Sequence, residues 1–230
     1  VSWFNTMPTL ITDHATRMEI ALQLPVSDTP ERVGEIMLAS LMLQDPSTEQ
    51  QGLDDLRRLA QDPRNATVRL RSGQLLGDTF YRMEEYEEAA RAWESVIEQD
   101  PTAGQSLNNL AFVLATELGD CTRAIDLATR ALDSQDVART IALSTLTVAY
   151  LECDRLDDAQ QTAAELESLA RGSPEEALAA VRTGQVALAR GDRDRAQAEA
   201  ARAESLLEAT QDRSASYRPM LEEFKTELGQ

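Results

Sequence analysis

Apolar and small residues recur every three or four positions through most of the chain, which is the spacing of amphipathic helices rather than of strands. Five small residues stand near the start of successive helical stretches: Gly52, Ala89, Ala124, Ala159 and Ala196. Their positions differ by 37, 35, 35 and 37. Each stretch follows another helical stretch and a short polar turn. A period in this range predicts a stack of helical hairpins, in which neighbouring units bury a shared apolar interior.

The stretch from Leu70 to Pro101 carries the most complete pattern of large, small and aromatic positions. Its marker residues are Leu76, Gly77, Phe80, Tyr86, Ala89, Trp93, Val96 and Pro101. This order resembles the tetratricopeptide repeat (TPR). Two helices approach to roughly 8–10 Å only where small side chains stand at the crossing. Gly77 and Ala89 are therefore expected to allow the close approach, and the aromatic residues to fill the space to the next hairpin.

The resemblance implies an all-α, right-handed α–α superhelix, that is, a solenoid of TPR-like hairpins. Four repeats are expected within residues 70–209, at about 70–103, 104–138, 139–173 and 174–209. The match is looser after the first repeat; Thr147, for example, replaces the usual small residue. A divergent hairpin is expected at 30–69, a tail and helix at 1–29, and a C-terminal capping helix at 210–230. The last helix would place Tyr217, Leu221, Phe224 and Leu228 on one side.

Charge narrows the choice of partner. The net charge is −18 and the sequence pI is about 4.4. A nucleic-acid-binding surface needs cations to neutralise phosphates, and an anionic membrane attracts them too. The composition therefore argues against both partners. It leaves enough apolar material for a core, with 42% hydrophobic residues, although only 4% are aromatic.

The two cysteines, Cys121 and Cys153, stand in the turns of neighbouring hairpins. A bridge between them is geometrically conceivable, but we expect two free thiols, because two cysteines make neither a disulfide framework nor a metal site. No apolar run has the length of a membrane span, and no signal-peptide pattern opens the chain. Since the chain begins at Val1, a fragment or a processed product is one interpretation. The compartment is left open: the cytoplasm is slightly favoured, and the periplasm is the alternative if a signal or anchor was removed.

The sequence offers little for catalysis. His14 is the only histidine, and no phosphate-binding loop or zinc motif occurs. Acidic residues such as Glu87 and Glu88 cluster at helix starts, where the helix dipole favours them. We therefore expect no catalytic residues, no metal and no cofactor, and a protein that is not an enzyme.

The resemblance implies that the first helix of each hairpin lines the concave side of the superhelix, where partners lie. The positions that match are Arg71, Gln74, Asp78, Tyr81, Arg82, Asn108, Asn109, Phe112, Ser144, Val148, Glu152, Arg182 and Gln185. Amides can pair with a peptide backbone, aromatic rings offer contact area and arginine can bind a carboxylate. The alternative is that these side chains only form the solvated faces of their helices and contact no partner.

One subset of the family grips the C-terminal carboxylate of chaperones with lysines, asparagines and an arginine. Asn109 fits one asparagine position of that clamp. Gln74 and Asp78 replace a lysine and an asparagine, and Ile141 and Thr145 replace the last basic pair. The clamp is therefore expected to be absent.

Together these features predict a non-catalytic scaffold or adaptor that binds a peptide segment or helix of a partner protein in the concave groove. One alternative is self-assembly through the apolar N-terminal tail around Trp3 and Phe4, since exposed aromatic residues often mark contacts. Another is a regulatory or recruiting arm of a larger protein with a catalytic domain upstream.

Overall fold

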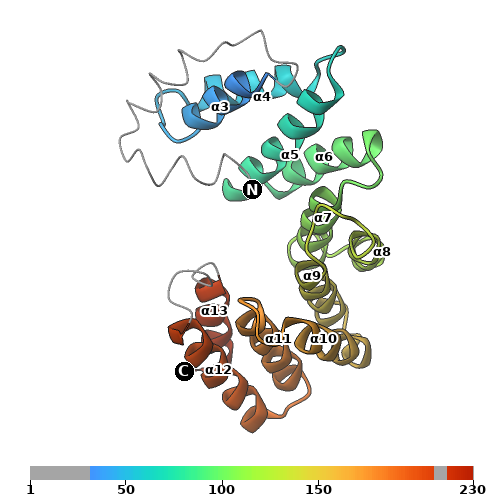
Figure 1. Cartoon of the computed structure of the whole chain (residues 1–230), viewed down its shortest axis with the longest axis vertical. Coiled ribbons are helices and arrows are strands. Elements are labelled where there is room, and N and C mark those ends of the chain that lie inside the picture. The colour runs from blue at the N-terminus through green and yellow to red at the C-terminus, as the bar shows by residue number, and fades with distance from the viewer. Residues whose placement is uncertain (1–31, 210–216, 230) are drawn as a thin grey trace. The chain divides into compact units, whose positions relative to one another are not determined.

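A computed structural model describes residues 32–209 and 217–229 (Figure 1). These residues form helices and no strand: α3 (Val33–Met42), α4 (Glu49–Ala60), α5 (Ala66–Arg82), α6 (Tyr86–Gln99), α7 (Gly104–Thr116), α8 (Cys121–Ala131), α9 (Arg139–Glu152), α10 (Leu156–Ala170), α11 (Glu176–Ala189), α12 (Arg193–Ala209) and α13 (Arg218–Leu228). The predicted all-α fold is thus confirmed. The expected tail and helix at 1–29, with Trp3, Phe4 and His14, lie outside the described residues.

The chain divides into two compact units, residues 1–101 and 102–230. In the first, the hairpin α3–α4 packs through α4 against the hairpin α5–α6. In the second, the hairpins α7–α8, α9–α10 and α11–α12 follow one another, and α13 packs against α11 and α12. Each unit is therefore a stack of antiparallel helix pairs.

In the first unit, close approach within the α5–α6 hairpin depends on Gly77. A Cβ at this position would lie 2.3 Å from Nε1 of Trp93, whose side chain is buried. Trp93 thus fills space inside its own hairpin. The helix α5 begins at Ala66, four residues before the expected limit of the repeat, because the Asn65 side chain caps it by accepting a hydrogen bond from the Val68 N–H at 3.1 Å.

The turns inside four hairpins share a backbone feature. A residue with positive φ follows the first helix in each: Glu84 (61°), Gly119 (69°), Asp154 (55°) and Gly191 (81°). The left-handed conformation ends the helix and reverses the chain. Glycine adopts it without strain, whereas Glu84 and Asp154 carry a Cβ that disfavours it.

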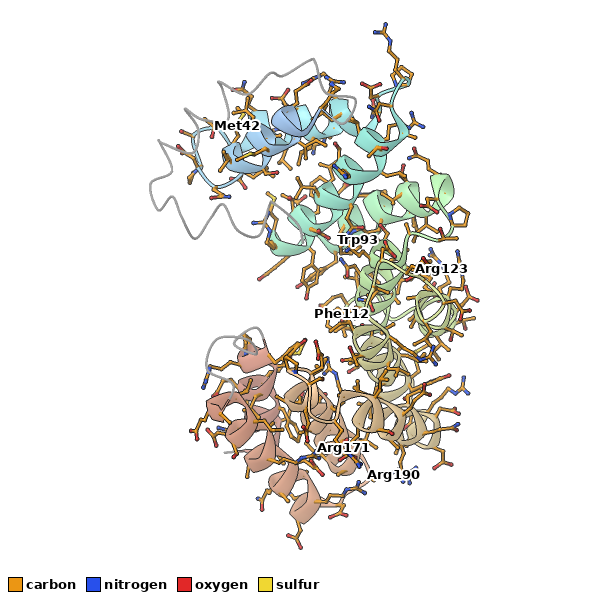
Figure 2. All side chains as sticks on the ribbon, viewed as in Figure 1. Met42, Trp93, Phe112, Arg123, Arg171 and Arg190 are labelled. Carbon is orange, nitrogen blue, oxygen red and sulfur yellow. A yellow bond between two sulfur atoms is a disulfide. The ribbon has the colours of Figure 1, made fainter. Side chains whose placement is uncertain are left out.

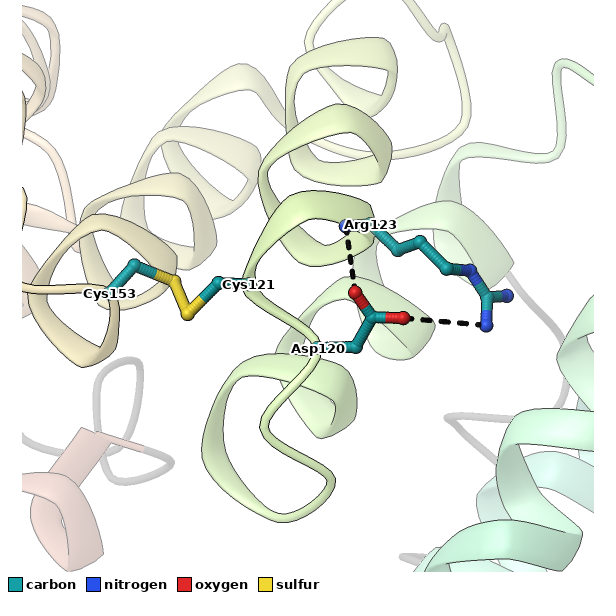
Figure 3. The surroundings of a disulfide bond; sticks show 4 residues. All are labelled: Asp120, Cys121, Arg123 and Cys153. Carbon is teal, nitrogen blue, oxygen red and sulfur yellow. Dashed lines mark hydrogen bonds and ion pairs between the residues drawn. A yellow bond between two sulfur atoms is a disulfide. The ribbon is translucent and has the colours of Figure 1, made fainter.

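The second unit contains a disulfide between Cys121, the first residue of α8, and Cys153, the residue directly after α9 (Figure 3). The expectation of two free thiols is wrong. Stacking of consecutive hairpins brings their turns together, so that the two Cα atoms lie 5.6 Å apart although the residues are 32 positions apart in the chain. That separation is ordinary for a disulfide.

The core of the second unit is rich in alanine, which lets its helices lie close together. Ala124, Ala159 and Ala196 are fully buried. At the end of the stack, α13 buries Leu221, Phe224 and Leu228 against α11 and α12. Phe224 lies against Gly184, where a Cβ would fall 2.5 Å from its ring.

Candidate functional site

Five of the predicted partner-binding residues lie on α5 in the first unit: Arg71, Gln74, Asp78, Tyr81 and Arg82. Their spacing of three, four and seven positions keeps most of them on one side of the helix. Arg71, Tyr81 and Arg82 are exposed, whereas Gln74 and Asp78 are half-buried. Tyr81 is 37% exposed, which is unusual among the large apolar side chains of the described part of the chain.

Contacts with α6 hold this part of α5 in place. Oδ1 of Asp78 accepts hydrogen bonds from Nε2 of Gln74 at 2.8 Å and from Nε1 of Trp93 at 3.2 Å. The Tyr81 ring lies 5.9 Å from the Tyr86 ring and 6.3 Å from the Trp93 ring, measured between centroids. Asp78 and Gln74 are thus partly engaged within the hairpin, and Tyr81 is an aromatic platform supported from behind.

In the second unit, α7 carries Asn108, Asn109 and Phe112, the last labelled in Figure 2. Asn108 is only 7% exposed and donates from Nδ2 to Oδ1 of Asn109 at 3.3 Å. Asn109 and Phe112 are half-buried and open to contact. Asn108 is therefore placed to orient Asn109 rather than to meet a partner itself.

Arg182 on α11 was predicted to contact a partner, but its side chain is buried and only 5% exposed. Its guanidinium donates from Nε to Oγ of Ser144 at 2.8 Å and from Nη1 to Oε1 of Gln185 at 2.7 Å. Burial lowers the pKa of Arg182 to about 10, against the opposing effect of Glu223 and Glu227. The side chain stays cationic at neutral pH and serves as an internal link between α9, α11 and α13.

Two carboxylates, those of Glu223 and Glu227, act on this buried arginine, and a third, that of Glu152, acts on Glu227. Burial and the neighbouring Glu223 and Glu152 raise the pKa of Glu227, against the lowering effects of the Gln185 side chain and Arg182. Glu152 comes from the end of α9 and the other two from α13. The two glutamates of α13 were not among the site residues predicted from the sequence. Their spacing of four positions on one side of a helix was the available signal.

Little else in the described part of the chain suggests chemistry. No three His, Cys, Asp or Glu side chains there are grouped in a way that could hold a metal ion. None of the described helices combines the length and the apolar character needed to cross a membrane.

Comparison with known proteins gives matches in structure alone. No protein-family model matches the sequence, and no curated protein is similar to it in sequence. Among solved structures, BtubC (BKLC) from P. vanneervenii is 20% identical with a TM-score of 0.66, over 86% of this chain and 90% of that chain.

Two further structures carry the repeat in their names. YrrB, a TPR protein with an unusual peptide-binding site, is 18% identical with a TM-score of 0.57, over 91% of this chain and 99% of that chain. A tetratricopeptide repeat protein from Parabacteroides merdae is 12% identical with a TM-score of 0.63, over 90% and 84% of the two chains. The chain therefore has the helical-repeat fold of the tetratricopeptide repeat proteins.

Proposed function

We propose that the protein is a non-catalytic scaffold that binds a peptide segment or helix of a partner protein through the exposed faces of its first helices. The single observation that carries this proposal is Tyr81, an aromatic side chain 37% exposed beside the exposed Arg82. Tyrosine and arginine are enriched among the residues that dominate binding energy in protein interfaces.

The arrangement around Tyr81 favours binding over simple solvation. Because its ring lies near those of Tyr86 and Trp93, little side-chain freedom remains to be lost on binding. In the second unit, Asn109 adds a side-chain amide and Phe112 a partly open aromatic surface. An amide beside an aromatic surface suits an extended peptide, whose backbone needs hydrogen-bond partners and whose side chains need apolar contact.

The similarity to YrrB is consistent with this proposal, since that protein is named for its peptide-binding site. The shared fold alone does not specify a ligand. The proposal therefore names a separate surface on each unit: Arg71, Tyr81 and Arg82 in the first, and Asn109 and Phe112 in the second. The buried Asn108 positions Asn109 through its hydrogen bond, and the buried Arg182 belongs to the interior of the second unit.

Site-specific cross-linking tests the proposal. A photoreactive amino acid replaces Tyr81 in one variant and Arg91, an exposed residue of α6, in a control variant. We expect position 81 to capture a defined protein that position 91 does not. The captured protein is then purified and its affinity measured for Tyr81→Ala, Arg82→Ala, Asn109→Ala and the control Arg91→Ala.

The first three substitutions are expected to weaken binding by about tenfold or more each, as removal of an interface anchor does, and Arg91→Ala to leave it unchanged. Circular dichroism establishes that each variant is folded. Equal capture at positions 81 and 91, or unchanged affinity in all three variants, would contradict binding by this surface.

A further inference from the structure

The second unit contains a pocket of about 180 Å³ between α10, α11 and the start of α12. Ala163, Val186 and Ala187 form its apolar part, and all three are buried in the stack. A water molecule occupies roughly 30 Å³ in the liquid, so the space fits a group of a few heavy atoms. The pocket is thus the size of a small acid or of one side chain, and none of its lining residues belongs to the surfaces proposed above.

One polar group in the wall of the pocket has no partner. Thr183 is 6% exposed, and its buried Oγ1 makes no hydrogen bond within the described part of the chain. Other helical threonines of this protein donate to the carbonyl four residues earlier: Thr79 to Leu75 at 2.7 Å and Thr147 to Leu143 at 2.8 Å. A buried hydroxyl without a partner costs free energy, and a bound polar group would remove that cost.

Several charged residues of the pocket are already engaged. Glu167 accepts from Arg202 at 2.6 Å, and Arg190 pairs with Asp157. Figure 2 labels Arg190 near the end of α11.

A third charged residue of the pocket, Asp192, directly precedes α12. Oδ1 of Asp192 accepts from the backbone N–H of Arg195 at 3.1 Å, so the carboxylate caps the helix and is compensated by its dipole. The guanidinium of Arg195 has no ion pair within the described residues.

The groups left for a ligand are all able to donate. They are the Arg195 guanidinium, the Gln160 amide and the Thr183 hydroxyl, and they come from three different helices around one apolar floor. Donors of this kind bind a carboxylate, and the guanidinium does so with a charge-assisted hydrogen bond. We propose that this pocket binds a carboxylate on a short aliphatic group, which is either a free small acid or the acidic side chain of a polypeptide.

The test is an NMR titration of the full chain labelled with nitrogen-15. Butyrate is the probe, and butyramide, which has the same shape without the charge, is its matched control. We expect saturable shifts of amide signals around the pocket with millimolar butyrate and none with butyramide. A third titration uses the peptide acetyl-Ala-Ala-Glu-Ala-Ala-amide, and a fourth its counterpart with glutamine in place of glutamate.

Two variants test whether Thr183 and Arg195 contribute to butyrate binding. Thr183→Val removes the hydroxyl while keeping the shape, and Arg195→Gln removes the charge; each is expected to weaken butyrate binding by about tenfold, as loss of a hydrogen bond to a charged group does. Arg91→Gln, which removes an equal charge from the first unit, should leave it unchanged. The titrations themselves show whether each variant is folded.

The peptide titrations distinguish the two sources of the carboxylate. Tighter binding of the glutamate peptide than of butyrate, with no binding of the glutamine peptide, identifies an acidic side chain. Binding of butyrate alone identifies a free acid, and either result supports the site. Three results would overturn the proposal: saturable shifts with butyramide, no saturable shift with any probe, or unchanged butyrate affinity in Thr183→Val. None of these results would bear on the proposed function.

Discussion

The indole of Trp93 rests on Gly77, and no other residue type fits between them without movement. A Cβ at position 77 would lie 2.3 Å from Nε1 and 2.5 Å from Cδ1 of the ring. Since Trp93 is buried and donates from the same nitrogen to Asp78 at 3.2 Å, the ring cannot move away without losing that bond. This contact fixes how closely α5 and α6 approach.

Gly77→Ala should therefore destabilise the protein. Alanine in place of glycine inside a helix normally gains about 1 kcal/mol, whereas forcing an extra carbon into a packed core costs about 1–3 kcal/mol. The overlap with the ring decides the sign, so we expect a net loss of up to about 2 kcal/mol in the free energy of unfolding, measured by urea denaturation. The same substitution in a Trp93→Leu background should be neutral or favourable. An equal loss in both backgrounds would show that the indole is not the cause.

The disulfide should contribute to the stability of the second unit. Closing a loop with cysteines 32 positions apart is worth about 3–4 kcal/mol when it restricts the unfolded chain. Adding a thiol reductant is therefore expected to lower the melting temperature of the wild-type protein. Cys153→Ser should show the lower value with and without reductant. A wild-type melting temperature that does not respond to reduction, in a sample shown to have free thiols, would contradict this role.

Much of the fold could be predicted from the sequence because helical periodicity and small residues at a fixed interval are local signals. The buried Ala124, Ala159 and Ala196 stand where the interval placed them. The disulfide could not be predicted with the same ease, since the approach of Cys121 to Cys153 depends on how one hairpin stacks on the next.

Prediction of the candidate surface from the sequence was limited in a similar way. The resemblance to the tetratricopeptide repeat assigned Tyr81, Arg82 and Arg182 to a partner; Tyr81 and Arg82 are exposed on α5, whereas Arg182 is buried. The burial of Arg182 depends on where α13 packs, with Met220 and two glutamates beside it. The pattern on α11 alone carries no information about that neighbour. The missing hydrogen bond of Thr183 is likewise a property of three-dimensional placement.

The raised pKa of Glu227 predicts how the stability of the protein depends on pH. Because the pKa of Glu227 is raised in the folded protein, the folded state binds this proton more tightly than the unfolded state, and stability falls as the pH rises from the unfolded value of about 4.3 through the folded value. Glu227→Gln should therefore raise the melting temperature at pH 7. The gain should shrink as the pH is lowered and vanish near pH 4.

The control for this experiment is Glu208→Gln, which removes an equal charge from the exposed end of α12. It reports the general effect of reducing the net charge of −18. The specific effect of Glu227 is the part of the gain that exceeds this control. A gain no larger than that of Glu208→Gln at every pH would show that burial, Glu223 and Glu152 together do not raise the pKa of Glu227.

The hairpin turn at Glu84 offers a stabilising substitution. Glu84 has a φ of 61° and an exposed side chain. A side chain in the left-handed conformation costs about 1–2 kcal/mol, and the extra freedom of glycine in the unfolded chain takes back about 0.5–1 kcal/mol. Glu84→Gly should therefore raise the free energy of unfolding by about 0.5–1 kcal/mol, measured by urea denaturation. Glu84→Ala keeps the Cβ and should bring no such gain, and Glu85→Gly, at a φ of −88°, should lower stability. If Glu84→Ala stabilised as much as Glu84→Gly, loss of the carboxylate beside Glu85 and Glu87 would be the cause, and backbone strain at this turn would not.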